Sequence, residues 1–411
     1  MSTPMEIHPE RPPEWPYEGL DLEELRREGW EPVPFQMFVV KLHERCNLAC
    51  DYCYMYELAD QSWRSRSLTM SREILSRTAH RISDHVRDHG LSSVSVVLHG
   101  GEPLLVGADM LDFAATTLRT CLPASTHLGL TVQTNGTLLT EEILQVLLRH
   151  EVRVGVSLDG GEQDNDRHRR YRDGRGSHSG VAAGLRLLNR PEYRSLFSGL
   201  LCTIDVENDP LEVYEGLLAF SPPRVDFLLP HGNWSARPPG RPADKSTPYA
   251  DWLIEIFEHW YHTPAPRVGV RTFQSIIAQL FGRPSMSEQF GLAPARLLVI
   301  DTDGSVQQVD TLKSAFEGAA ETTLNVISHS FDTALSLAPI AARQIGVRAL
   351  CESCGNCPVR DVCGGGFYVH RYREGSGFRN PSVYCPDLMK LITHIRDRVH
   401  AELAPIIGRR P

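Results

Sequence analysis

The chain has 411 residues, enough for two or three domains or for one large barrel with an appendage. Its 41% apolar and 23% charged residues are ordinary for a globular protein, and its net charge of −9 argues against nucleic acid as the main partner. No apolar run approaches the roughly 20 residues of a membrane span, and the first residues lack the cationic segment and apolar core of a signal peptide. We therefore expect a cytoplasmic protein without membrane contact.

The first half of the chain alternates between apolar runs and amphipathic ones. Residues 1–33, rich in Pro and Glu without periodicity, predict an extended N-terminal lead-in. The expected strands are 35–42, 94–99, 128–133, 153–158, 198–205 and 225–229. The expected helices are 71–89, 107–121, 140–150, 179–189 and 209–220. This alternation predicts βαβ units and a parallel sheet. Because six strands are fewer than the eight of a complete TIM barrel, we predict an α/β fold with a partial (β/α)6 TIM-type barrel over residues 34–245.

The second half departs from this alternation. A loop rich in Pro, Gly and Arg covers 230–248, and loops of that length are usually functional or disordered. A helix is expected at 249–262, followed by a mixed stretch to about 293 and a β-hairpin at 295–310 with Asp303 and Gly304 at its turn. We assign residues 246–345 to a bridging region and 346–411 to a cysteine-rich, loop-like domain with a C-terminal helix.

The ten cysteines are too few for a disulfide scaffold and are placed unevenly. Three lie at 46–53 and five at 351–385, a clustering typical of metal or Fe–S ligands in a reducing compartment. Cys121 and Cys202 stand alone and are interpreted as core residues.

Cys46, Cys50 and Cys53 directly follow the first expected strand, at the end where α/β folds place ligand sites. Three thiolates do not fill a four-coordinate structural zinc site, and an odd number cannot close into disulfides. A cubane held by three thiolates, in contrast, keeps one iron free for another ligand. A zinc site with a distant fourth ligand remains the alternative.

The spacing C-x3-C-x2-C, with Tyr52 before the last Cys, resembles the signature of the radical S-adenosylmethionine (SAM) superfamily. "HGGEPLL" at 99–105 closes the second strand and is similar to the GGEP motif of that superfamily. The resemblance implies that the free iron binds the amino and carboxylate groups of SAM and that SAM is cleaved to a 5′-deoxyadenosyl radical. It also implies that the two glycines let backbone carbonyls approach the SAM ammonium and that the acidic residue adds negative charge nearby.

The "QTNG" at 133–136 and the "SLDG" at 157–160 occupy positions that bind the ribose and carboxylate of SAM in similar enzymes. The cofactor-binding residues implied by the resemblance are Gly100, Gly101, Glu102, Pro103, Asn135, Ser157, Asp159 and Arg169. For the last three, ordinary polar groups near strand ends are the alternative. The Arg-rich run 167–175 suits either an acidic peptide or solvent.

The tail resembles the SPASM extension of peptide-modifying radical SAM enzymes, whose pattern is C-x2-C-x5-C-x3-C and a later Cys. The ligands that the resemblance implies for an auxiliary 4Fe–4S cluster are Cys354, Cys357, Cys363 and Cys385. Phe367 stands where the pattern has its fourth Cys, and 292–310 carries no thiol for a second auxiliary cluster. We therefore expect SAM and two 4Fe–4S clusters as cofactors, with Cys351 as a possible alternate ligand. A zinc ion held by four Cys is the alternative for the tail.

Four stretches are similar to a branch of SPASM enzymes that builds cyclophanes: "PHGNW", "DGSVQQVDTLK", "VCGGGF" and "HRYREGSGFRNPSVYC". The resemblance implies a C–C bond between an aromatic ring carbon and the β-carbon of a residue two positions downstream in a ribosomally synthesised precursor peptide. We expect an external electron donor of the flavodoxin or ferredoxin type. Asp310 is the candidate proton acceptor, or else an ordinary strand-end Asp. His231 and Trp234 are candidates for the peptide groove, or else loop packing.

Three other functions stay open. Thioether formation on a Cys-bearing peptide and a sulfatase-maturase-like oxidation of Ser or Cys share the same core, although sulfatase maturases resemble a pattern with two auxiliary clusters. A non-catalytic Fe–S protein that binds peptides is the third, and the GGEP and SAM-pocket motifs weigh against it.

Overall fold

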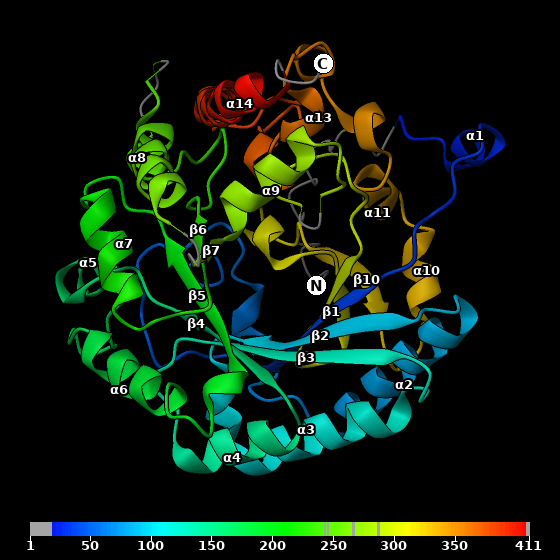
Figure 1. Cartoon of the computed structure of the whole chain (residues 1–411). Helices are drawn as coiled ribbons and strands as arrows, with labels where there is room; N and C mark the ends of the chain where they lie inside the picture. Colours follow the sequence, from blue (N-terminus) through cyan, green and yellow to red (C-terminus); the bar gives the residue numbers. More distant parts are fainter. Residues whose placement is uncertain (1–18, 242–243, 245, 265–267, 286–287, 408–411) are drawn as a thin grey trace, which may run out of the picture.

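The computed structural model describes residues 19–241, 244, 246–264, 268–285 and 288–407. A sheet of ten strands lies at the centre, in the order β10-β9-β8-β1-β2-β3-β4-β5-β6-β7 (Figure 1). Its strands are Met37–His43 (β1), Ser93–Gly100 (β2), His127–Thr134 (β3), Arg153–Ser157 (β4), Phe197–Thr203 (β5), Arg224–Leu228 (β6), Gly269–Val270 (β7), Leu297–Ile300 (β8), Ser305–Gln307 (β9) and Glu321–Asn325 (β10). The predicted α/β fold with a parallel core is confirmed, and the six expected strands β1 to β6 all form.

The sheet is larger than the six strands that the sequence predicts. Strand β7 pairs in parallel with β6, and β8 pairs in parallel with β1, so two strands of the bridging region extend the barrel on both sides. Strands β8, β9 and β10 are antiparallel to one another. The expected hairpin at 295–310 is therefore present as β8 and β9. At its turn, the amide of Gly304 donates to the carbonyl of Asp301 at 2.9 Å. The sheet stays open, with β7 and β10 at its edges.

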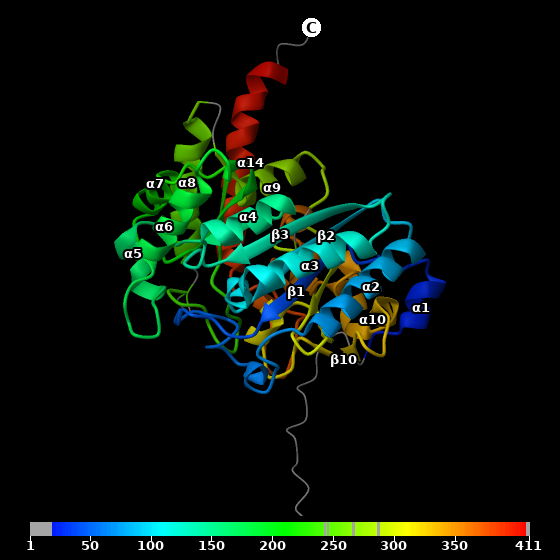
Figure 2. The same ribbon diagram turned by 90° about the horizontal axis from the view of Figure 1, so that it is seen from below.

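Helices cover the outer face of the sheet. They are Arg72–Asp88 (α2), Gly107–Cys121 (α3), Glu141–Arg149 (α4), Glu162–His168 (α5), His178–Leu188 (α6) and Pro210–Leu218 (α7). Helices α2, α3 and α4 lie side by side (Figures 1 and 2). Helix α2 shows why the sequence folds so: the Ser71 hydroxyl accepts from the amide of Ile74 at 3.1 Å, and Gly90 follows its end with a φ of +58°.

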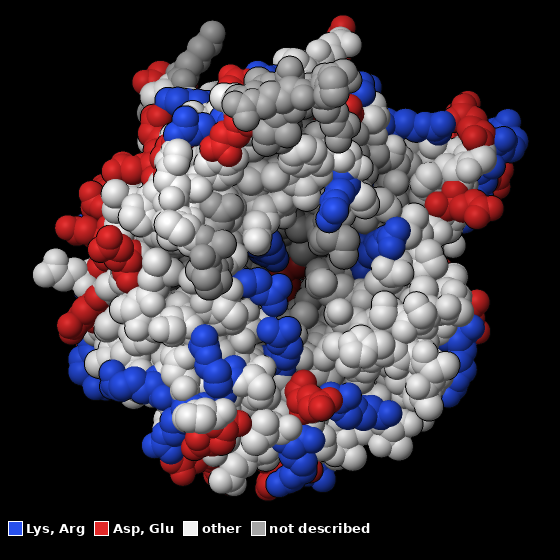
Figure 3. Space-filling view, viewed as in Figure 1, with Lys and Arg blue, Asp and Glu red and all other residues white. Residues whose placement is uncertain are grey.

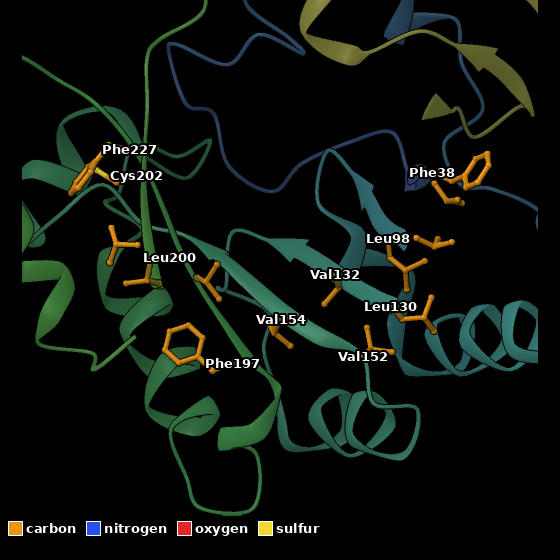
Figure 4. Close-up of a cluster of buried hydrophobic side chains, with 14 of the residues drawn as sticks. Phe38, Leu98, Leu130, Val132, Val152, Val154, Phe197, Leu200, Cys202 and Phe227 are labelled. Atoms are coloured by element: carbon orange, nitrogen blue, oxygen red, sulfur yellow. The ribbon is translucent and has the colours of Figure 1, made fainter. Parts of the chain in front are cut away.

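The two faces of the strands differ in burial with a period of two. Along β2, alternate residues Val94, Val96 and Leu98 are buried under the helices, while the residues between them are partly accessible. Figure 4 shows the buried side chains of neighbouring strands gathered in one cluster. The other face of the strands is thereby left for the interior of the barrel.

The second half supplies Pro248–His262 (α8), Arg271–Leu280 (α9), Phe331–Leu335 (α10), Ala338–Ala342 (α11), Glu352–Gly355 (α12), Arg360–Cys363 (α13) and Cys385–Ile407 (α14). The long helix α14 packs against α8 and α9. Among the described residues, no helix has the length and hydropathy that crossing a membrane requires. The face seen in Figure 3 is hollowed near its centre, and Lys and Arg side chains border the opening.

Two sequence predictions need correction. The lead-in expected to be extended contains the helix Leu22–Arg27 (α1), because the Asp21 carboxylate caps the amides of Glu23 and Glu24 and Leu25 packs against Ile345 and Ala349; its residues 1–18 lie outside the described part. The tail expected to be loop-like contains α12, α13 and the 3₁₀ turn Tyr368–Arg371. Elements of four to six residues are too short to show a helical period.

Candidate functional site

A cavity of about 550 Å³ lies at the carboxyl ends of the parallel strands. Its walls include His99 of β2, Gln133 of β3, Ser157 of β4, Thr203 of β5 and Leu228 of β6. Each of these residues belongs to the strand face that the helices leave uncovered, since its neighbours in the strand are buried against the helices. The cavity therefore lies where parallel α/β barrels carry their active sites.

The three thiols of the 46–53 cluster all line this cavity. Their loop leaves the end of β1 and is fixed by backbone hydrogen bonds, including that of the Ala49 amide to the Arg170 carbonyl at 2.7 Å. Burial raises the pKa of Cys50 to about 11 and that of Cys53 to about 12. Thiolates at such positions need nearby positive charge, which a bound metal supplies.

The spacing of the thiols also bears on which metal group fits. In the described part of the chain, the one group of three His, Cys, Asp or Glu ligand atoms within 4.8 Å of one another is His85, His89 and Asp332, which contains no thiol. A tetrahedral zinc with Zn–S bonds of about 2.3 Å needs sulfurs about 3.8 Å apart. Among the described residues, no three thiols of either cluster lie within 4.8 Å of one another, as a single zinc would require.

The two glycines of "HGGEPLL" allow the cysteine loop to approach β2. A Cβ on Gly100 would lie 2.2 Å from the carbonyl oxygen of His43, and a Cβ on Gly101 would lie 1.9 Å from the Tyr56 hydroxyl and 2.5 Å from the Arg45 carbonyl carbon. Both glycines line the cavity, and their contact with SAM stays a prediction. Glycine is required at both positions because the loop that carries the thiols leaves no room for a Cβ. This reason could not be seen in the sequence.

Glu102 lies behind the cavity wall, near the thiol of Cys46. Its side chain is fully buried and accepts hydrogen bonds from the amide of Leu104 at 3.0 Å, the hydroxyl of Thr134 at 2.6 Å and the amide of Asn135 at 2.8 Å. Burial raises the pKa of this carboxyl. The carboxylate thus fixes the end of β3 and does not line the cavity. Pro103, which begins the 3₁₀ turn Pro103–Val106, is likewise buried outside the lining.

Asn135 lies in the cavity wall beside the first thiol. Its amide nitrogen donates to the Asn47 side chain at 2.8 Å and to the Cys46 sulfur at 3.6 Å. Ser157 also lines the cavity, and its hydroxyl accepts from the Gln133 amide at 3.0 Å. Both residues therefore share one cavity with the three thiols, and their contact with a cofactor stays a prediction.

A buried network connects the cysteine loop to the later strands. The Tyr52 hydroxyl donates to Asp159 and accepts from the Arg169 guanidinium at 2.8 Å, while Asp159 also accepts from the Thr203 amide at 2.9 Å. Arg169 lines the cavity, whereas Asp159 lies behind it and lines a smaller neighbouring pocket. Burial raises the pKa of Asp159. Asp159 is thus better described as a residue that positions Tyr52 than as a direct cofactor contact.

Asp310 belongs to a buried charge cluster that the sequence did not indicate. The Lys41 ammonium, fully buried on β1, lies 2.9 Å from Asp310 and 3.1 Å from Asp301. Lys313 lies 3.9 Å from Asp301 in the same cluster. Asp310 does not line the cavity. Burial and then the nearby charge of Asp310 raise the pKa of Tyr54, which does line it. Lys41 stands in an otherwise apolar strand, and no sequence pattern predicted its pairing with Asp310 and Asp301.

The five thiols of the tail come together as well. Cys351 contacts Cys354, and Cys385, the first residue of α14, neighbours Cys351 and Cys357. Cys363 in turn neighbours Cys357 and Cys385. Position alone therefore does not set Cys351 apart from the four predicted ligands.

The guanidinium of Arg371 organises the backbone beside these thiols. It is buried and donates to the carbonyls of Gly364, Gly365 and Gly366, three successive residues with positive φ. Gly364 has no room for a side chain, because a Cβ there would lie 1.8 Å from the Gly291 carbonyl oxygen. The "VCGGGF" stretch thus folds tightly around Cys363.

A second cavity, of about 220 Å³, lies beside the first. The two share Tyr54, Leu228, Leu229 and His231 in their walls. His231 therefore lines the region between them, as expected for a substrate groove. Trp234 lines neither cavity: its indole donates to the Pro381 carbonyl at 2.7 Å, and the Arg373 guanidinium lies 4.8 Å from its ring, so this residue packs the loop against the tail. A place for Trp234 in the peptide groove stays a prediction.

Comparison with known proteins agrees with this geometry. Residues 40–212 match the family model of the radical SAM superfamily. The serine-type anaerobic sulfatase-maturating enzyme of Klebsiella aerogenes is 24% identical over 355 residues, which cover 86% of this chain and 84% of that enzyme. The cysteine-type enzyme of Clostridium perfringens is 24% identical over 292 residues, 67% of this chain and 74% of that enzyme.

Two solved structures show the same fold. Native anSMEcpe with bound AdoMet and the Cp18Cys peptide has a TM-score of 0.74 at 20% identity and covers 90% of this chain and 100% of its own. Streptococcus suis SuiB bound to its precursor peptide SuiA has a TM-score of 0.58 at 14% identity, covering 88% and 78%. The fold and the strand-end cavity define an α/β-barrel enzyme. Its residues 40–212 match the radical SAM family model, and this match together with the three thiols of the cavity supports SAM and 4Fe–4S clusters as cofactors.

Proposed function

We propose that this radical SAM enzyme acts on a ribosomally synthesised precursor peptide and joins an aromatic ring carbon to the β-carbon of a residue two positions downstream. A peptide substrate is supported by two structures of the same fold, which are described as bound to the Cp18Cys peptide and to SuiA. The cyclophane chemistry is supported by the four sequence stretches that resemble the cyclophane-forming branch and by the single set of auxiliary thiols.

The observation that carries the proposal is the order of sites along the interior. The thiols of Cys46, Cys50 and Cys53 line the first cavity, and the second cavity lies between this one and the tail that holds the other five thiols. When bound at the first thiols, SAM and its cluster supply a 5′-deoxyadenosyl radical that can take a hydrogen atom from a carbon. A substrate placed across both cavities would lie between the two groups of thiols.

Closing the ring removes one hydrogen atom from the β-carbon and then one electron and one proton from the ring. The electron suits the auxiliary thiol cluster, since Phe367, His370 and Asp387 of the tail that carries those thiols line the second cavity. We assign the proton to Asp310. The Lys41 ammonium, 2.9 Å away, stabilises the negative charge of Asp310. The charge of Asp310 also acts on Tyr54, which lines both cavities. An external electron donor of the flavodoxin or ferredoxin type would start each turnover.

Oxidation of a Ser or Cys side chain is the second candidate. It is favoured by the sulfatase-maturating enzymes, which align with as much as 86% of this chain. Against it, the described residues 292–310 contain no thiol, so this chain lacks one of the clusters that the resemblance associates with those enzymes.

The product decides between the candidates. Reduced enzyme, SAM and the cognate precursor should yield a peptide that has lost two hydrogens per crosslink. Because oxidation of Ser to an aldehyde also removes two hydrogens, the product should be treated with a hydrazine reagent, which must not react with a cyclophane. Tandem mass spectrometry should show no cleavage between the joined residues, and every Cys of the peptide should remain open to alkylation, which excludes a thioether.

Isotopes test the direction of the reaction. Deuterium on the β-carbon of the downstream residue should appear in 5′-deoxyadenosine, and the aromatic ring should lose one hydrogen to solvent. Transfer from an α-carbon, a hydrazine-reactive product or a blocked Cys would each refute the cyclophane proposal. Failure of the reduced protein to cleave SAM would favour a non-catalytic peptide-binding protein instead.

A further inference from the structure

The second cavity has apolar walls from several elements of both halves of the chain. Phe227 and Leu229 come from the sixth strand and its end, Phe290 from the bridging region, and Leu388 and Leu391 from α14. An engineered cavity of about 150 Å³ with similar walls binds benzene. At about 220 Å³, this cavity has room for a larger aromatic ring.

Two histidines are among the polar groups of the cavity wall, which also include Thr272, Gln289, Thr311 and Asp387. Both ring nitrogens of His370 and Nδ1 of His231 are buried and have no hydrogen-bond partner among the described residues. The two rings lie 5.5 Å apart, and both line the cavity. Burial lowers the pKa of His231 to about 4 and that of His370 well below its usual range, so both imidazoles are neutral and each offers one N–H and one acceptor nitrogen.

Unpaired buried groups of this kind are uncommon and costly, at about 1–3 kcal/mol each. A ligand that supplies one hydrogen-bond donor would pair with one acceptor nitrogen and remove part of this cost, whereas a purely hydrocarbon ligand would remove none of it. The arrangement therefore discriminates between ligands that have the same shape but differ in one donor group.

Phe367, four residues after Cys363 in the sequence, adds an aromatic ring to the wall of this cavity. Its ring centre lies 5.7 Å from that of His231 and 5.5 Å from that of His370. The residue occupies the position where the SPASM pattern has a Cys, so the change from thiol to ring turns a ligand position into part of the cavity wall.

We propose that the second cavity binds the aromatic side chain of the peptide substrate, an indole or phenol ring, and that His231 and His370 accept the hydrogen bond of its N–H or O–H group. This inference rests on the proposed function and narrows it: Trp and Tyr are preferred over Phe as the residue to be joined. The ring then lies against Tyr54 and His231, which separate it from the first cavity where the hydrogen atom is removed.

Binding of small rings tests the pocket without any turnover. Full-length protein carrying its clusters is titrated by calorimetry with indole and with benzofuran, which has the same shape and a ring oxygen in place of N–H. We expect indole to bind about tenfold more tightly, equivalent to about 1.4 kcal/mol. His370→Phe should reduce this preference, and Leu391→Phe, which fills the cavity from α14, should weaken the binding of both rings.

The control is an exposed ring outside both cavities. Phe281 is 58% exposed, and Phe281→Leu should leave both affinities unchanged. Equal affinities for indole and benzofuran in the unaltered protein, or unchanged indole binding in Leu391→Phe, would overturn the proposal. The proposed function can be refuted independently of the pocket. If indole binds as expected but the peptide is not crosslinked, the aromatic pocket is supported and the cyclophane function is refuted. A Leu391→Phe enzyme that crosslinks its peptide at the unaltered rate refutes the pocket and keeps the function.

Discussion

Gly101→Ala should remove the cluster of the first cavity without altering any thiol. The added Cβ would lie 1.9 Å from the Tyr56 hydroxyl and 2.5 Å from the Arg45 carbonyl carbon. Carbon atoms in favourable contact are about 3.5 Å apart, so the Arg45 backbone must retreat by about 1 Å. The same backbone is held by the Glu102 amide, which donates to the Arg45 carbonyl at 3.0 Å. Overpacking of this kind costs about 1–3 kcal/mol, and here it falls on the residue next to Cys46.

The assay counts iron and measures SAM cleavage in anaerobically reconstituted protein. The unaltered chain should bind about eight irons in two cubanes, and Gly101→Ala should retain about four and release no 5′-deoxyadenosine. A chain with Cys46, Cys50 and Cys53 all replaced by Ala sets the benchmark for complete loss of this cluster. Twelve irons in the unaltered chain would instead reveal a third cluster.

Gly129→Ala is the matched control. Gly129 lies in β3 with the Ser95 hydroxyl 3.6 Å from the position of a Cβ, an ordinary contact, so this variant should keep its iron and its activity. Adding Tyr56→Phe to Gly101→Ala should not restore the cluster, because the Arg45 backbone still collides. Full iron content and SAM cleavage in Gly101→Ala would refute the argument that this glycine positions the cysteine loop.

Three further predictions concern thiols and buried charges. Cys357→Ser should lose the auxiliary iron and Cys351→Ser should be milder; equal iron loss in the two variants would contradict the ligand assignment. Lys41→Met leaves Asp310 without its cation at 2.9 Å and Asp301 with Lys313 alone at 3.9 Å, and it should destabilise the protein by about 3–5 kcal/mol, seen as a lower thermal midpoint than in any single carboxylate variant. Asp310→Asn keeps the contact of Lys41 with Asp301 at 3.1 Å and should still release 5′-deoxyadenosine while forming little crosslinked peptide, whereas normal crosslinking would exclude it as the proton acceptor.

The fold could be predicted where its signals are local. The six central strands are buried on the helix side and partly covered on the other, so they appear as apolar runs, and the Ser71 cap and the Gly90 stop mark α2 directly. Strand β7 has only two residues, and β8 joins the sheet through a partner far away in the sequence. No local pattern records such pairing, which explains why the sheet is wider than expected.

The site divides in the same way. Cys46 and Gly101 belong to compact motifs and could be found from the sequence. His370 acquires its position only because the tail folds back against Tyr54 and His231, and Trp234 is turned away by its bond to the Pro381 carbonyl. A motif fixes which residues can do chemistry, but contacts between distant segments decide which of them face the substrate.

The pairing of β1 with β8 has a consequence for the order in which the protein matures. Lys41 and Asp301 are 260 residues apart in sequence, and Val39 stands opposite Val299. At a synthesis rate of about 5–20 residues per second, the strand that leads into the first three thiols waits roughly 13–52 s for its second neighbour. Until β8 has been synthesised, one edge of β1 is unpaired, and Lys41 lacks both of its partners Asp301 and Asp310. The edge of β1 beside the first three thiols is therefore paired only after the second half is translated, and a chain that ends before residue 297 leaves this edge open and lacks the five thiols of the tail.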